Sequence, residues 1–153
     1  MGGADASLPV VRVRGVGPDD AAAVGALLDA LGYPCTQAEA AERIDHFRND
    51  ARQFLLLAER DGGAPCGLAA VQLNYSLTRG ADVARITAMV VSPECHGEGI
   101  GRRLLREIET LARRNGAIRL EVTSNPSRTG AHAFYHACGY GDGSNHFVKL
   151  LGD

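Results

Sequence analysis

Segments of strand length alternate along the chain with segments of helical spacing. Residues 10–16 alternate valine with arginine, which is the period of a half-buried strand. Short polar turns at 61–63 and 78–82 separate three further apolar runs, and this order predicts an antiparallel meander. The runs of the meander are 53–60, 66–77 and 83–91.

Helical spacing of apolar residues predicts four helices. The first opens at Pro18 and stops at Gly32. The second begins at Thr36, which stands three residues before Glu39 in the spacing of a capping box. The third follows a glycine-rich loop and ends at Gly116. The predicted helices cover 18–31, 36–48, 100–112 and 130–138, and further strands are predicted at 118–123 and 146–150.

Length and composition indicate one folded domain. The 153 residues are 45% hydrophobic, which suits a sizeable core. We expect a flexible leader at 1–9 and a single α+β domain at 10–153 with a mixed, mostly antiparallel sheet. The formal net charge of −2 argues against a nucleic-acid-binding protein. No apolar stretch suits a membrane span and the N-terminus lacks a signal-peptide pattern, so we expect a cytoplasmic protein without membrane contact.

The cysteines and histidines do not form a metal-binding pattern. The four cysteines are widely spaced and include no Cys-x-x-Cys pair, so neither a zinc site nor a disulfide framework is predicted. His132 and His136 share a helix face at metal-ligand spacing, but no His-Glu-x-x-His pattern accompanies them. We therefore expect surface histidines and no metal.

The segment 92–106 carries the strongest chemical signal. It places Gly97, Gly99 and Gly101 at alternate positions between an apolar strand and an amphipathic helix. Such a loop leaves backbone N–H groups free at a helix N-terminus, where the helix dipole favours an anion. The spacing therefore predicts a pyrophosphate site.

Cations at the start of this helix agree with a bound anion. Arg102, Arg103 and Arg106 lie where they oppose the helix dipole, and a polyphosphate would reverse that cost. A tight turn into an ordinary amphipathic helix explains the same residues, so the loop alone leaves both interpretations open. The first two glycines, with Glu121 about 20 residues on, also imitate the fingerprint of a dinucleotide-binding oxidoreductase. That fingerprint requires a third glycine at Arg102 and strands of βαβ type, which this sequence lacks.

Three stretches in order resemble the GCN5-related N-acetyltransferase (GNAT) family. Residues 89–93 resemble the family's fourth strand and the proline that follows it. Residues 96–101 resemble the Arg/Gln-x-x-Gly-x-Gly/Ala signature, and residues 128–140 resemble the final helix with its Phe-Tyr pair and a following Gly-Phe/Tyr. The similarity covers 10–150 and implies a GNAT-type sheet flanked by helices on both faces.

The resemblance implies acetyl-CoA as the donor and a primary amine as the acceptor, which attacks directly in a ternary complex. Backbone groups of Met89 and Val91 would pair with the pantetheine arm at a bulge where the fourth and fifth strands separate. An N–H there could polarise the thioester carbonyl. The residues implied to bind the coenzyme are Met89, Val90, Val91, His96, Gly97, Glu98, Gly99, Ile100, Gly101, Arg102 and Arg128.

Tyr135 matches the family's tyrosine that protonates the departing thiolate. A phenol of pKa about 10 can donate to a thiolate of pKa about 8.5 as charge develops. The alternative is a core aromatic beside Phe134. His96 departs from the family, which usually has Arg or Gln there, and a neutral imidazole weakens a side-chain contact with the phosphates. Backbone amides could still hold the pyrophosphate.

A general base is missing from the expected strand. Many family members place a carboxylate on the fourth strand, but Arg85, Thr87 and Ala88 occupy the candidate positions. An ordered water, a carboxylate elsewhere such as Glu121, or an acceptor amine that arrives neutral would each serve, so no base is assigned. The same absence leaves open a non-catalytic CoA-binding sensor or interaction module on this fold.

The acceptor is less well specified than the donor. In the family the region of the second helix roofs the acceptor site, so the resemblance places Tyr33, His46, Phe47 and Tyr75 there, although packing explains these aromatics equally well. A small-molecule amine and a protein amine both remain candidates. The sequence does not specify the oligomeric state, and a homodimer is compatible with relatives that pair through late strands.

Overall fold

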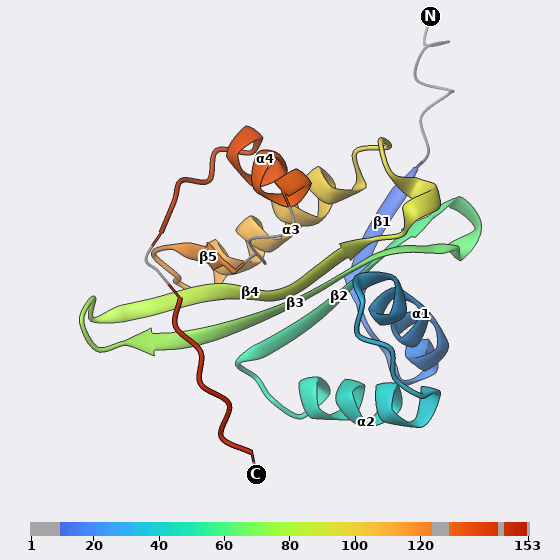
Figure 1. The fold of residues 1–153 in the computed structure, drawn as a ribbon, viewed down its shortest axis with the longest axis horizontal. Coiled ribbons are helices and arrows are strands. Elements are labelled where there is room, and N and C mark those ends of the chain that lie inside the picture. Colours follow the sequence, from blue (N-terminus) through green and yellow to red (C-terminus); the bar gives the residue numbers. More distant parts are fainter. Residues whose placement is uncertain (1–9, 124–128, 144–145, 153) are drawn as a thin grey trace, which may run out of the picture. The chain divides into compact units, whose positions relative to one another are not determined.

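A computed structural model describes residues 10–123, 129–143 and 146–152 of the chain. These residues belong to two compact units, divided between Thr123 and Ser124. The first unit contains a five-stranded sheet with three α-helices, and the second contains helix α4 and the C-terminal segment (Figure 1).

Four strands of the sheet form an antiparallel meander in which each strand pairs with the next along the chain. A fifth strand, β5, adds to the edge in parallel with β4. The meander and the mixed, mostly antiparallel sheet are therefore confirmed, and a dinucleotide fold built from parallel βαβ units is excluded for this unit. The strands are β1 (Val11–Gly15), β2 (Gln53–Arg60), β3 (Pro65–Ser76), β4 (Ala81–Val91) and β5 (Leu120–Val122).

Helices α1 (Ala21–Leu31) and α2 (Gln37–Arg48) cover one face of this sheet (Figure 1). The expected capping box starts α2, because the Glu39 N–H donates to Thr36 Oγ1 at 3.0 Å and the Thr36 N–H donates to Glu39 Oε1 at 2.8 Å. The apolar stripes of both helices bury against alternate residues of the sheet. This core contains Val16, Ala21, Val24, Leu27, Ala40, Ile44, Leu57 and Leu68.

Helix α3 (Ile100–Arg114) covers the opposite face, as the resemblance implied for a GNAT-type sheet. Its buried side recurs at helical spacing, with Ile100, Leu104 and Ile108 each at most 1% exposed. The first turns of α3 lie against Gly67 on β3, where a side chain would collide with the helix. Because α3 follows the glycine loop directly, this close packing also determines where the loop lies.

The second unit differs from the sequence expectation in one element. Helix α4 (Thr129–Ala137) is present, close to the predicted 130–138. The closing strand predicted at 146–150 is wrong, since residues 146–152 have no regular secondary structure. An alternating apolar run becomes a strand only when its backbone finds a neighbouring edge, and none of the described residues pairs with it. Phe147 and Leu150 are accordingly 89% and 87% exposed.

No helix within the described ranges is long and apolar enough to cross a bilayer. The predicted leader at 1–9 and Arg128 lie outside the described residues.

Candidate active site

Strand β4 carries a bulge next to the point where its ladder with β5 ends. The register of β4 against β3 shifts between Ala70 and Val71, so Thr87 is an extra residue on β4. The parallel ladder with β5 ends one residue earlier, at Ile86, whereas β4 continues to Val91. The bulge that the resemblance implied is therefore present, and the C-terminal part of β4 extends beyond its ladder with β5.

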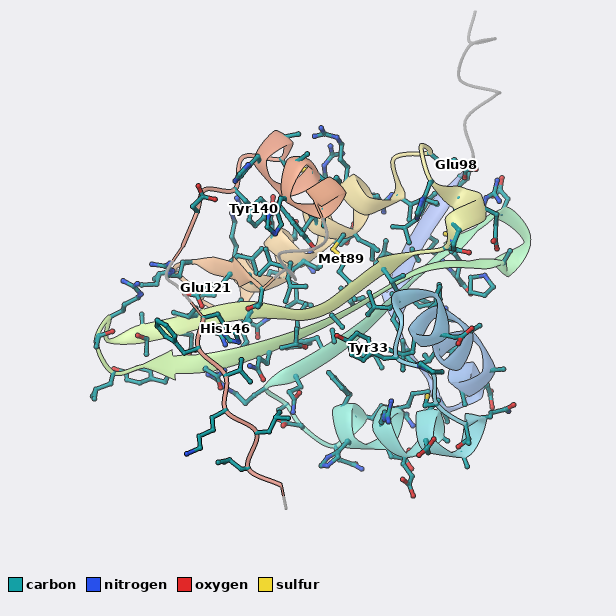
Figure 2. The ribbon with its side chains drawn as sticks, in the orientation of Figure 1. Tyr33, Met89, Glu98, Glu121, Tyr140 and His146 are labelled. Atoms are coloured by element: carbon teal, nitrogen blue, oxygen red, sulfur yellow. The ribbon has the colours of Figure 1, made fainter. Side chains whose placement is uncertain are left out.

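The residues expected to meet the pantetheine arm lie on this extension. Met89 and Val91 lie on β4 beyond the bulge, and Figure 2 labels Met89 there. The side chain of Val90 packs against the core beneath α1. Side chains alternate between the two faces of a strand, so Met89 and Val91 are on the face opposite to Val90.

The glycine loop after β4 has the backbone conformation that only glycine adopts without strain. A short 3-10 turn, η4 (Pro93–Cys95), leads from β4 into the loop. Gly97 has φ 84° and Gly99 has φ 80°, both in the left-handed region, and Gly99 is the N-cap residue of α3. A Cβ added at either glycine would meet nothing within 4 Å. The surface of the loop is therefore open to a ligand at both positions.

Six consecutive backbone N–H groups, those of 97–102, lie in this loop and the start of α3. The first backbone hydrogen bond of α3 runs from the Arg103 N–H to the Gly99 carbonyl, at 3.1 Å. The N–H groups of 97–102 meet no protein acceptor in the described part of the chain, as expected for a loop that ends at a helix N-terminus. Several N–H groups at the positive end of a helix dipole form a site suited to a diphosphate.

Two of the three arginines at the start of α3 could face an anion. Arg102 and Arg106 are exposed, and neither makes an ion pair within the described ranges. Arg103 is committed elsewhere, because its Nη1 donates to the Val11 carbonyl at 3.2 Å and its Nη2 lies 3.2 Å from Glu107 Oε2. A polyphosphate contact therefore stays a prediction for Arg102 and Arg106, whereas Arg103 is held by other partners.

His96 has a partner that the sequence did not predict. Its Nε2 lies 2.9 Å from the Val91 carbonyl oxygen, and since a carbonyl only accepts, the imidazole donates. This hydrogen bond links the two ends of the segment 91–96, where β4 ends and the glycine loop begins. His96 acts on the last residue of β4 in this structure, where the family's Arg or Gln was expected to contact phosphate.

An ion pair behind the loop was also missed by the sequence analysis. Arg60, the last residue of β2, donates from Nη2 to Glu98 Oε2 at 3.2 Å and from Nη1 to Cys95 Sγ at 3.6 Å. These residues lie 38 and 35 positions apart in the sequence, and no local pattern links them. Only the pairing of β2 with its neighbours in the sheet brings Arg60 to the loop.

Tyr135 lies on α4, in the second unit. Its ring is half-buried and packs edge-on against Phe134 and Tyr140, with centroid distances of 5.3 and 5.8 Å. Burial raises the pKa of Tyr135 above its ordinary value near 10. The phenol is therefore protonated at neutral pH, which is the form that a proton donor requires.

The four residues expected at the acceptor site divide into two groups. His46 and Phe47 line a hollow of about 150 Å³ together with Arg43 and Gln53, where the end of α2 meets the start of β2. Tyr33 and Tyr75 do not line it and are 61% and 68% exposed. Of the four residues, His46 and Phe47 therefore line the hollow, whereas Tyr33 and Tyr75 lie on the exposed surface.

Comparison with known proteins identifies the fold and the family. The sequence matches the acetyltransferase (GNAT) family over residues 22–140, a span that includes the bulge, the glycine loop and Tyr135. The chain belongs to this family. It is an N-acetyltransferase, and GNAT enzymes take their acetyl group from acetyl-CoA.

Two curated N-acetyltransferases are among the relatives of this GNAT protein. An aminoglycoside N(6')-acetyltransferase type 1 from Stenotrophomonas maltophilia is 30% identical over 138 residues, which is 88% of either chain. An aminoalkylphosphonate N-acetyltransferase from Salmonella typhimurium is 34% identical over 95 residues, 62% of this chain and 61% of the relative.

Solved structures agree with this fold. A GNAT acetyltransferase from Staphylococcus aureus superposes with a TM-score of 0.79 at 24% identity and covers 92% of this chain and 98% of its own. An aminoglycoside N-acetyltransferase in complex with CoA superposes with a TM-score of 0.82 at 13% identity, covering 93% of this chain and 95% of its own. At these identities the likeness concerns the fold alone.

Proposed function

We propose that this GNAT protein transfers the acetyl group of acetyl-CoA to the primary amine of a small molecule. The observation that carries the proposal is the row of N–H groups over 97–102 at the N-terminus of α3, which meets no acceptor among the described residues and suits the diphosphate of the coenzyme. Two relatives named for small amines, an aminoglycoside and an aminoalkylphosphonate, support this class of acceptor.

In the proposed reaction, the glycine loop, β4 and Tyr135 each have a separate role. The donors of 97–102 hold the diphosphate, and the part of β4 beyond Thr87 aligns the pantetheine arm. The acceptor nitrogen attacks the thioester carbonyl carbon, and the carbon–sulfur bond breaks. The sulfur takes the phenolic proton of Tyr135, the nitrogen releases a proton to solvent, and the phenolate is then reprotonated from solvent.

A carboxylate base is not part of this proposal. Glu121, the acidic residue considered from the sequence, accepts from Arg85 Nη2 at 3.1 Å, and its other oxygen lies 3.0 Å from Arg119 Nε. With both oxygens held by arginines, this carboxylate fastens β5 to β4. The acceptor amine would then enter in its neutral form or lose its proton to water.

The activity is tested by release of free CoA thiol from acetyl-CoA in the presence of a panel of amines. The panel contains an aminoglycoside with a 6'-amine, an aminoalkylphosphonate and a lysine peptide. We expect acceptor-dependent release with a small-molecule amine. If the protein binds CoA in calorimetry but none of the amines causes thiol release, it would instead be a sensor on this fold. If it fails to bind CoA, the proposal is refuted.

The role of Tyr135 is tested by Tyr135→Phe. Loss of the proton donor should lower kcat about 100-fold while the Kd for CoA stays unchanged, because the hydroxyl acts on the leaving group. Tyr140→Phe is the matched control, since it removes the same hydroxyl from the neighbouring ring, and its kcat should stay within about threefold of the wild type. Equal kcat values for Tyr135→Phe and wild type would remove Tyr135 from the mechanism.

A further inference from the structure

Glu98 is an acidic residue in the middle of a loop proposed to hold a dianionic diphosphate. It is the only carboxylate in the stretch 95–102, and Figure 2 shows it on the loop between β4 and α3. Like charges at a few ångströms repel, so a free carboxylate here would oppose the coenzyme. Binding of the diphosphate therefore requires an interaction that neutralises the Glu98 carboxylate or keeps it away from the ligand.

Arg60 provides this interaction through an ion pair with Glu98. Its Nη2 lies 3.2 Å from Glu98 Oε2, and the two side chains are only 36% and 25% exposed, so solvent screens the pair less than an open surface pair. The second oxygen, Glu98 Oε1, is buried and has no hydrogen-bond partner within the described residues. The carboxylate is thus turned into the protein and held there by one cation.

Among the described residues, the ion pair of Arg60 is with Glu98. Its Nη1 reaches Cys95, which is 2% exposed and lies beside the buried Cys66. Burial raises the pKa of the Cys66 thiol to about 11, so that thiol carries no charge near neutrality. Glu94 forms its side-chain hydrogen bond with Ser92, and Arg60 helps to lower the pKa of Glu94 only through space. Within the described residues, Glu98 is therefore the one carboxylate in direct contact with Arg60, which touches the chain on both sides of Gly97.

We propose that Arg60 is a positioning residue for the coenzyme loop: it neutralises Glu98 and draws that carboxylate away from the diphosphate, while its contact with Cys95 holds the entrance of the loop on β2. This inference rests on the proposed function, because it presumes that the loop takes the diphosphate of CoA. The effect belongs to the diphosphate alone and should be absent for any ligand that lacks it.

The experiment compares CoA with a truncated ligand in four variants. Arg60→Gln leaves Glu98 unpaired and should raise the Kd for CoA about tenfold. Glu98→Gln should bind CoA at least as tightly as wild type, and the double variant should return to within about threefold of wild type, because no unpaired carboxylate remains. Arg60→Lys keeps the charge and should lose at most about threefold. Calorimetry gives each Kd, and S-acetylpantetheine is the ligand without a diphosphate.

Arg52→Gln is the matched control. Arg52 lies beside the other end of β2 and pairs with Asp82 at 2.6 Å, so its loss removes a comparable ion pair far from the loop. We expect similar melting temperatures for Arg52→Gln and Arg60→Gln but a changed Kd for CoA only in the latter. The tenfold loss should also shrink at high salt, as repulsion is screened.

Three outcomes would overturn the inference. These are a double variant as weak as Arg60→Gln, an equal loss of affinity for S-acetylpantetheine, and a Kd for CoA unchanged by Arg60→Gln. In each case wild-type binding of CoA still supports the proposed function. If wild type binds no CoA, the proposed function fails first, so the two failures are distinguishable.

Discussion

Replacing Gly67 with alanine tests the packing that positions helix α3 and, with it, the coenzyme loop. A Cβ at residue 67 would lie 2.9 Å from Leu104 Cδ1, 3.2 Å from Ile100 Cγ2 and 3.4 Å from Ala58 Cβ. Carbon atoms in good contact are about 3.5–4.0 Å apart. The added methyl group therefore overlaps two side chains in the first turns of α3.

The size of the expected loss in the free energy of unfolding depends on how little these neighbouring side chains can move. Leu104 and Ile100 are 0% and 1% exposed, so neither can turn outward, and the branched Ile100 is also stiff at χ1. Overpacking of this kind costs about 1–3 kcal/mol. Alanine also lowers the conformational entropy of the unfolded chain relative to glycine, which offsets about 0.4–1 kcal/mol of this cost. The net expectation is a loss of about 1–2 kcal/mol in the free energy of unfolding, or about 3–6 °C in Tm.

Urea unfolding of four variants checks this reasoning. Gly15→Ala is the control, because Gly15 also lies on a strand and a Cβ there meets nothing within 4 Å, so its stability should be unchanged or slightly raised. Leu104→Ala alone should cost about 2–5 kcal/mol. The double variant Gly67→Ala/Leu104→Ala should cost at least about 1 kcal/mol less than the sum, because the new methyl fills part of the cavity. A neutral Gly67→Ala, or strictly additive costs, would refute the argument.

Two further predictions concern the loop and the pH dependence of stability. Gly97→Ala and Gly116→Ala both force alanine into the left-handed region, at φ 84° and 77°, and should each lose about 1–2 kcal/mol of stability, but only Gly97→Ala should weaken CoA binding in calorimetry; equal Kd values for the two variants would place the diphosphate elsewhere. Two hydrogen bonds from Arg14, at 2.8 Å each, are the main cause that lowers the pKa of Asp20 from 3.8 to about 2. The advantage of wild type over Asp20→Asn should therefore be complete above pH 3.8, at about 1–2 kcal/mol, and should vanish as the pH falls through 2; urea midpoints from pH 6 to pH 2 that stay equally separated would contradict this.

Local patterns were sufficient for most elements of the fold. Capping at Thr36, the turn at 61–63 and the apolar stripe of α3 each depend on residues within a few positions of one another, so they are legible in the sequence. The run 146–150 has a strand pattern, yet it forms no strand, because strands depend on partners that sequence periodicity does not specify.

The candidate site divides in the same way. The glycine loop and its helix could be predicted, since a strand, three alternating glycines and an amphipathic helix are consecutive in the chain. The role of His96 could not, because its bond to the Val91 carbonyl depends on how the turn between them closes. Glu98 was expected among the coenzyme-binding residues, but its partner Arg60 comes from a strand 38 residues earlier.

The sequence by itself determined the order of the elements, the glycine loop, the donors of 97–102 and the resemblance to GNAT enzymes, because each is encoded in neighbouring residues. Only the tertiary structure decided which charges meet, as with Arg60 and Glu98 or Arg103 and the Val11 carbonyl. The reason is that ion pairs are made across strands and helices brought together by burial of their apolar faces. Hydrophobic patterning selects those faces, whereas the contacts between polar groups follow from the register and packing that result.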